Sequence, residues 1–232
     1  IVTALSIISC KKEEVMLPKS NVSIMTEIHD HSPVYMLYRE EGKDTLAEIN
    51  TKNKIGTTNW VFNIDKRLPL HAIIPNIAEL QLKKKDGMHK KEGTINVFSY
   101  ADSLKQNLAF FPFTDVRYFY DKDFSKFYIK DNAELYMSYN NFTINFKKNG
   151  KVTVDGHAIE KEELVSYIKD FSDFMSDGKP TILHLNFDKY LTFNDYIQNK
   201  LMLWQITSEN IQFSSYEFIY DETKLPECGC EL

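Results

Sequence analysis

Two versions of one eight-residue segment decide how this chain is organised. The first is Asn63-Ile64-Asp65-Lys66-Arg67-Leu68-Pro69-Leu70, and the second begins 123 residues later as Asn186-Phe187-Asp188-Lys189-Tyr190-Leu191-Thr192-Phe193. In both, an apolar stretch ends at an Asp-Lys pair. The pattern predicts a strand that ends at the Asp, then a turn and a helix.

Two further pairs of segments recur in the same order. Residues 38–45 (YREEGKDT) resemble residues 146–153 (FKKNGKVT) at an offset of 108, and residues 95–100 (INVFSY) resemble residues 211–216 (IQFSSY) at 116. Three collinear matches indicate an internal duplication. Each unit is predicted to run strand, Gly-Lys hairpin, strand, connection, strand ending at Asp-Lys, helix, strand.

The changing offsets show where the two units differ. The second unit has extra residues before its Asp-Lys pair, in which Ile159, Leu164, Ile168 and Phe171 share one face of a predicted amphipathic helix. The corresponding residues 49–59 of the first unit are too polar for a good helix. We also expect strands at 142–146, 151–154, 181–187 and 211–220, and a helix over 193–204 capped by Thr192 or Asn194. In the first unit Pro75 predicts a helix that is short, kinked or replaced.

These elements predict an α+β fold of two tandem units, each a small, mainly β-sheet structure with helices on one face. We expect a signal remnant, lipid-attachment Cys and linker at 1–20, the first unit at 21–103, and the second unit at 132–223. Residues 104–131, rich in Phe and Tyr, are expected to form an extended connector packed across both units, and residues 224–232 a Cys-containing tail.

Composition excludes some partners. The 43% of hydrophobic residues is typical of a globular protein. The net charge of −5 gives no reason to expect nucleic acid as a partner, because binding its phosphates needs a basic face. Lysines do gather at Lys83, Lys84, Lys85, Lys90 and Lys91. We interpret them as a solvated loop, with an anionic-lipid or nucleic-acid patch as the alternative.

The amino terminus predicts a membrane anchor. Residues 1–9 (IVTALSIIS) have the length of a signal-peptide core, and Cys10 and a charged run follow. Residues 7–10 resemble the lipobox whose Cys is acylated in bacterial lipoproteins, so Cys10 is the predicted lipidation site. We therefore expect a lipid-anchored protein of the cell envelope, in the periplasm or at the outer-membrane surface. The alternative is a buried first strand with a core Cys.

The second unit resembles the periplasmic domain of the ExbD/TolR family of biopolymer-transport proteins. The resemblance covers roughly residues 142–220: the hairpin through Gly150-Lys151, the helix start at Glu162-Glu163-Leu164, the strand from Pro180, and Asp188 at its end. Phe193 and Tyr196 fall where the family has its helix aromatic. The family's proton-driven function needs an Asp on a transmembrane helix, and this chain shows no such helix. The resemblance implies only docking onto envelope proteins or the cell wall.

The search for chemistry yields few candidates. The sequence contains no G-x-S-x-G, P-loop or dinucleotide-binding fingerprint, so we expect no enzymatic activity and no cofactor. His29 and His31 would share one face of a strand and are the weak metal candidates. Cys228 and Cys230 permit a disulfide, an interchain bond, a soft-metal site or an ordinary tail.

Asp65 and Asp188, the matched acidic pair, are candidate binding residues together with Phe193 and Tyr196. The alternative for both Asp side chains, which we favour, is to cap the turn that follows. The sequence thus predicts a non-enzymatic lipoprotein that binds other proteins, with a TonB- or Tol-type transport complex as a possible partner. The alternatives are a peptidoglycan- or glycan-binding lipoprotein, and a metal or redox protein using His29/His31 or Cys228/Cys230.

Overall fold

The computed structural model describes residues 14–42, 44–87, 91–121, 123–174 and 178–225. Cys10, Cys228 and Cys230 lie outside these ranges. Within them the chain forms two mixed sheets of six strands each. The elements are β1 (Lys19–Ser20), β2 (His31–Glu41), β3 (Asp44–Asn50), β4 (Asn59–Ile64), α1 (Leu70–Lys85), β5 (Asn96–Asp102), β6 (Asn107–Pro112), β7 (Arg117–Asp121), α2 (Ser125–Asp131), α3 (Ala133–Tyr136), β8 (Asn140–Phe146), β9 (Val152–Val154), β10 (His157–Ile159), α4 (Leu164–Phe174), β11 (Thr181–Asp188), α5 (Phe193–Trp204), β12 (Ile211–Tyr220) and a final 3₁₀ turn, Glu222–Lys224.

The two units share one topology, which confirms the predicted α+β fold with two sheet units. In the first, β2 pairs antiparallel with β3 and parallel with β4, and β4 pairs parallel with β5. In the second, β8, β9, β11 and β12 make the same pairings. Gly42 and Gly150, the matched hairpin glycines, both have positive φ, +65° and +83°. Because a glycine adopts this conformation without strain, the two hairpins close in corresponding places.

The segment between the units supplies a strand to each sheet. Strand β6 pairs antiparallel with β5, and β7 pairs parallel with β12. The short helices α2 and α3 then cover the face of the second sheet opposite α4 and α5. The second sheet therefore has helices on both faces, where the sequence predicted helices on one face.

Two local predictions about helices were wrong. Helix α1 is 16 residues long despite Pro75, which is exposed on its surface. Burial of four apolar side chains, Ile73, Ile74, Ile77 and Leu80, at about 1.5–3 kcal/mol each outweighs the ~3 kcal/mol cost of a helical Pro.

Helix α4 begins at Leu164 rather than Ile159, because Asp155 and Gly156 turn the chain with φ of +51° and +88°. This Asp-Gly turn pairs Ile159 with Val152 as a strand. Helix α5 has the predicted bounds, and Thr192 is its N-cap.

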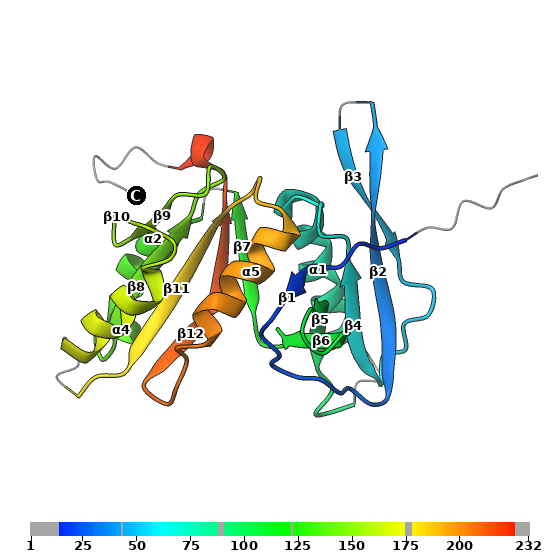
Figure 1. The fold of residues 1–232 in the computed structure, drawn as a ribbon, viewed down its shortest axis with the longest axis horizontal. Helices are drawn as coiled ribbons and strands as arrows, with labels where there is room; N and C mark the ends of the chain where they lie inside the picture. The colour runs from blue at the N-terminus through cyan, green and yellow to red at the C-terminus, as the bar shows by residue number, and fades with distance from the viewer. Residues whose placement is uncertain (1–13, 43, 88–90, 122, 175–177, 226–232) are drawn as a thin grey trace, which may run out of the picture.

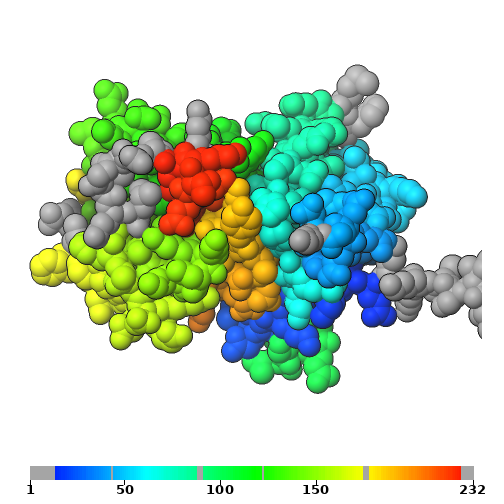
Figure 2. All heavy atoms as spheres, turned by 90° about the horizontal axis from the view of Figure 1, so that it is seen from above, coloured from blue at the N-terminus to red at the C-terminus, as the bar shows by residue number. Residues whose placement is uncertain are grey.

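Helices α1 and α5 lie between the two sheets, as Figure 1 shows. One hydrophobic core includes buried side chains of α1, of α5 and of both sheets, so both units contribute to it. Tyr196 of α5, for example, packs on Phe187 of its own sheet (ring centroids 4.8 Å apart) and on Phe98 of the other sheet (6.0 Å). In the space-filling view α5, in orange, directly abuts the first unit (Figure 2). The units are thus joined by a shared helical layer.

The outer face of the second sheet holds a fully buried histidine under α3. His184 bonds through Nε2 to Asn141 Oδ1 at 3.0 Å, and the amide nitrogen of Asn141 donates to the Tyr136 and Tyr139 carbonyls. Nε2 of His184 is therefore the protonated nitrogen. Its Nδ1 is buried and has no hydrogen-bond partner among the described residues. Burial lowers the pKa of His184 from 6.5 to about 4, because a second proton would be desolvated there.

We expect His184 to destabilise the fold in acid. The unfolded chain binds a proton on this residue near pH 6.5, whereas the folded chain does so only near pH 4. The free energy of unfolding should therefore fall by about 3 kcal/mol as pH drops from 6.5 to 4. Urea unfolding of wild type and His184→Gln across this range measures the effect.

His157, exposed on β10, provides the matched control. His157→Gln should keep the acid-dependent loss of stability, and His184→Gln should remove most of it. Equal pH profiles for the two variants would contradict the assignment.

Candidate binding cleft at the junction of the two units

The two copies of the repeated segment bind each other through their backbones. Four hydrogen bonds connect them: Leu70 N–H to the Leu191 carbonyl (2.9 Å), Phe193 N–H to the Leu68 carbonyl (2.8 Å), His71 N–H to the Lys189 carbonyl (3.0 Å) and Asn194 N–H to the Lys66 carbonyl (3.0 Å). Each bond has a counterpart shifted by 123 residues in both donor and acceptor. The two units are therefore related by an approximate two-fold axis at this point.

This exchange satisfies the N–H groups at the start of both helices. Pro69, the N-cap of α1, makes no side-chain cap, so the carbonyls of the second unit take that role. Helix α5 has in addition a capping box formed by Thr192 and Asp195. The orientation of each helix is thus fixed by the other unit.

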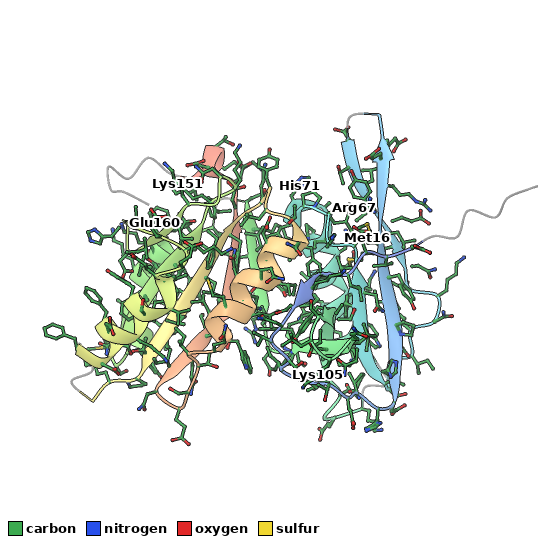
Figure 3. The ribbon with its side chains drawn as sticks, in the orientation of Figure 1. Met16, Arg67, His71, Lys105, Lys151 and Glu160 are labelled. Atoms are coloured by element: carbon green, nitrogen blue, oxygen red, sulfur yellow. The ribbon has the colours of Figure 1, made fainter. Side chains whose placement is uncertain are left out.

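Asp65 and Asp188 shape the turns that lead into this junction. Both side chains are buried, and each accepts a backbone N–H two residues ahead, from Arg67 at 3.0 Å and from Tyr190 at 2.8 Å. Asp65 also pairs with the Arg67 guanidinium and accepts the Met16 N–H (Figure 3). Burial raises the pKa of Asp65, but the hydrogen bonds from Arg67 and Met16 outweigh it and lower the pKa overall.

Phe193 and Tyr196 lie inside the shared helical layer and are fully buried. Phe193 packs edge-on against Phe98 of the first unit, with ring centroids 5.3 Å apart. The structure thus brings all four predicted binding residues to the junction, and all four are buried. Phe193 and Tyr196 pack against the first unit. Asp65 and Asp188 bond within their own turns.

Next to them lies a buried ionic cluster that sequence reasoning missed. Lys200 of α5 forms an ion pair with Glu217 of β12, and these side chains are 1% and 2% exposed. The Tyr196 hydroxyl donates to Glu217 Oε2 at 2.5 Å, and the Tyr118 hydroxyl lies 3.3 Å from that of Tyr196. Burial lowers the pKa of Lys200, which Glu217 partly offsets, and burial raises the pKa of both tyrosines.

The ionic cluster belongs to one unit only. At the repeat offsets of 123 and 116, Lys200 corresponds to Ile77 and Glu217 to Ala101, so comparison of the two copies could have revealed it. The Lys200 ammonium also lies over the Phe111 ring of the first sheet, 4.6 Å from the ring centroid. The cluster therefore ties α5 to strands of both sheets.

A cleft of about 900 Å³ opens beside this cluster. Its walls are the C-terminal half of α1, residues 114–119 leading into and along β7, the segment from Lys91 to the start of β5, and the middle of β12. Tyr118 belongs both to the cleft wall and to the ionic cluster. Four cationic side chains, those of Lys84, Lys85, Lys91 and Arg117, line it together with one carboxylate, Asp115.

The interpretation of the lysine-rich segment as a solvated loop was wrong for Lys83, Lys84 and Lys85, which are helical. Lys83, Lys84 and Lys85 form the last turn of α1, where cations stabilise the helix end. Lys84 turns inward and donates to Asn96 Oδ1 at 2.9 Å and to the Ile95 carbonyl at 3.3 Å. Burial lowers its pKa from 10.5 to about 8.

The remaining predicted residues lie apart from the cleft. His29 precedes β2 and His31 begins it, and Asp30 between them has φ of +47°. The prediction that the two histidines share one face of a strand was therefore wrong. His29 lies 3.8 Å from Glu27 in an exposed pair. Among the residues that the structure describes, no three His, Cys, Asp or Glu side chains are grouped for metal binding.

Comparison with known proteins gives no relative: no family model matches the chain, and neither a curated protein nor a solved structure matches it significantly. No helix in the described ranges is long and apolar enough to cross a membrane. Inference about function therefore rests on the chain's own residues and geometry.

The buried ion pair yields a stability prediction. Lys200→Met alone should cost about 3–5 kcal/mol, because it leaves Glu217 buried without a counterion. The double variant Lys200→Met/Glu217→Gln should be more stable than the sum of the single variants implies, by about 2–3 kcal/mol. Urea unfolding of the four proteins measures this coupling energy.

The exposed pair Glu79 and Lys83 on α1 serves as the control cycle. Its coupling energy should be much smaller, because both side chains are 60% exposed and solvent screens their attraction. A coupling of that size for Lys200 and Glu217 would show that the buried pair does not act as a unit.

Proposed function

We propose that this protein is a non-enzymatic lipoprotein of the cell envelope, anchored through Cys10, that binds a partner protein by accepting one of its strands at β3. The observation that carries the proposal is the edge of the first sheet. Strand β3 pairs with β2 over seven residues, and no described residue pairs with its other edge. Such an edge offers unpaired backbone N–H and C=O groups to another chain.

Strand β3 is the most open of the sheet edges. The β2–β3 hairpin projects beyond the rest of the molecule in Figure 1. The strand contains neither Lys nor Pro, which commonly protect edges, and its Leu46 side chain is 45% exposed. Leu46 and Tyr35 lie on the sheet face away from α1 and α5, and none of the helices in the described ranges covers that face. A strand added beside β3 would therefore find apolar contacts there.

The other edges are shorter or partly covered. Strand β6 forms an antiparallel bridge between Phe110 and Met25, β10 has three residues and β7 has five. Strand addition needs several consecutive backbone pairs to stabilise a complex. Length and exposure together favour β3.

The chain enters the fold on the same unit. The Lys66 N–H donates to the Met16 carbonyl at 2.7 Å, and the Ala101 N–H to the Pro18 carbonyl at 2.8 Å. Residues 16–20 are thus attached to the first sheet, which also carries β3. An anchor at Cys10 would hold this sheet, with its open edge, near the membrane where envelope complexes assemble.

A charge at the β3 edge should weaken partner binding. We expect Leu46→Lys to reduce the partner recovered from cross-linked envelopes about fivefold, which corresponds to about 1 kcal/mol for a lost cross-strand contact. Mass spectrometry of the co-purified proteins gives the measurement. Components of a TonB- or Tol-type complex, or an outer-membrane transporter, are the expected partners.

Leu104→Lys is the matched control, because Leu104 is an exposed leucine in the turn between β5 and β6. It should leave recovery unchanged, whereas Cys10→Ser should lower it by releasing the protein from the membrane. Equal recovery with Leu46→Lys and wild type would refute the β3 site. Retention on purified cell wall, with no protein partner, would instead favour the glycan-binding alternative.

A further inference from the structure

The cleft beside α1 contains a cation without a counterion. Lys84 is half-buried, and its ammonium group has three hydrogen atoms to donate. Two go to Asn96 Oδ1 and the Ile95 carbonyl, and no described carboxylate lies within ion-pair distance of it. Its neighbour Lys83 pairs with Glu79 instead. One donor of Lys84 therefore remains for a group in the cleft.

The position of Lys84 at the end of α1 does not explain why it turns inward. Lys83 and Lys85 occupy the same helical turn, interact with the same helix dipole and remain exposed. The ammonium of Lys84 instead lies 4.9 Å from the centre of the Trp60 ring and loses hydration. The attraction of the Trp60 ring for the ammonium and the two hydrogen bonds compensate part of this loss. A negative charge in the cleft would offset the rest.

The surroundings of Lys84 are strongly cationic. Lys85, Lys91 and Arg117 also line the cleft, and Asp115 is the one carboxylate on its walls. Lys91 is matched by Asp30 at 3.3 Å outside the cleft lining. The excess positive charge thus comes from Lys84 and Lys85 on α1 and from Arg117 on β7. All three residues line the same cleft.

The cleft also has polar and apolar surface suited to a small molecule. Thr94 and Thr114 line it, as do Phe119 and Tyr216, whose rings also pack against Tyr128 of α2. The Arg117 guanidinium lies 6.0 Å from the Tyr216 ring centre, so charge and aromatic surface adjoin. A volume of about 900 Å³ falls within the range of small-molecule sites.

We propose that this cleft binds a phosphorylated organic molecule, with its phosphate between Lys84 and Arg117 and its apolar part against Phe119 and Tyr216. Lys84, Lys85 and Arg117, against the one carboxylate of Asp115, leave a net charge of +2 in the cleft. This charge matches a phosphate dianion better than it matches a singly charged carboxylate ligand. Arg117 supplies the forked donors that phosphate oxygens accept in pairs. The phosphate monoester can belong to a free metabolite or to a lipid headgroup, and the chemistry of recognition is the same. This site is separate from the β3 edge.

Titration calorimetry with phenyl phosphate tests the proposal. Wild type should bind it, and Lys84→Met, which keeps the aliphatic stem, should weaken binding at least tenfold. Lys83→Met is the control and should bind like wild type, because Lys83 lies outside the cleft lining and is 60% exposed. Arg117→Gln should also weaken binding. Because Arg117 is exposed on β7, this substitution should leave the protein folded.

The pH dependence gives a second readout. The phosphate is a dianion above pH ~7. The other charged side chains that line the cleft are those of Lys85, Lys91, Arg117 and Asp115. Wild-type affinity should fall as pH rises above 8, because Lys84, with a pKa of about 8, loses its proton. Lys84→Met should bind with the same weak affinity across this range.

Vesicles distinguish the source of the phosphate. The ligand would be a lipid headgroup if the protein binds vesicles that contain phosphatidic acid, does not bind phenyl phosphate, and loses vesicle binding in the Lys84→Met variant. The proposal would be overturned by absence of binding to both probes, by equal losses in Lys84→Met and Lys83→Met, or by benzoate binding as tightly as phenyl phosphate.

Discussion

The exchange of backbone hydrogen bonds between residues 66–71 and 189–194 is the constraint on which the rest of this structure depends. Each unit supplies backbone carbonyls to the helix start of the other. Helix α1, which has no side-chain cap of its own, depends on them most. The exchange holds α1 and α5 in one layer between the sheets. The ionic cluster and the cleft both lie beside that layer.

The two units differ in the residues of their buried layer and in the helices that cover their sheets. The first has isoleucine and alanine at the positions where the second has Lys200 and Glu217. Helices α2 and α3 cover the outer face of the second sheet, whereas no helix of the described residues covers the outer face of the first. A duplicated scaffold thereby presents two distinct surfaces, an open sheet edge on one unit and a cationic cleft at the junction. The proposed functions use these two asymmetries.

Local signals in the sequence predicted local structure well. The bounds of α5 followed from Thr192 and the apolar spacing, and both Gly-Lys hairpins were confirmed at Gly42 and Gly150. The prediction for α1 was wrong because Pro75 is a local signal, and the free energy gained by burying the helix between two sheets is larger. The start of α4 was wrong because the Asp155-Gly156 hairpin signal was overlooked, although the sequence contains it.

The sequence by itself determined the duplication, the order of strands and helices in each unit, and the turns at Asp65 and Asp188, since these depend on periodicity and on hydrogen bonds between near neighbours. Only the tertiary structure decided that the two Asp-Lys segments bind each other and that Phe193 and Tyr196 are buried. It also decided that Lys84, one of three consecutive lysines, turns into a cleft. These outcomes depend on contacts between residues far apart in the chain, whose free energy exists only once the sheets have packed around α1 and α5.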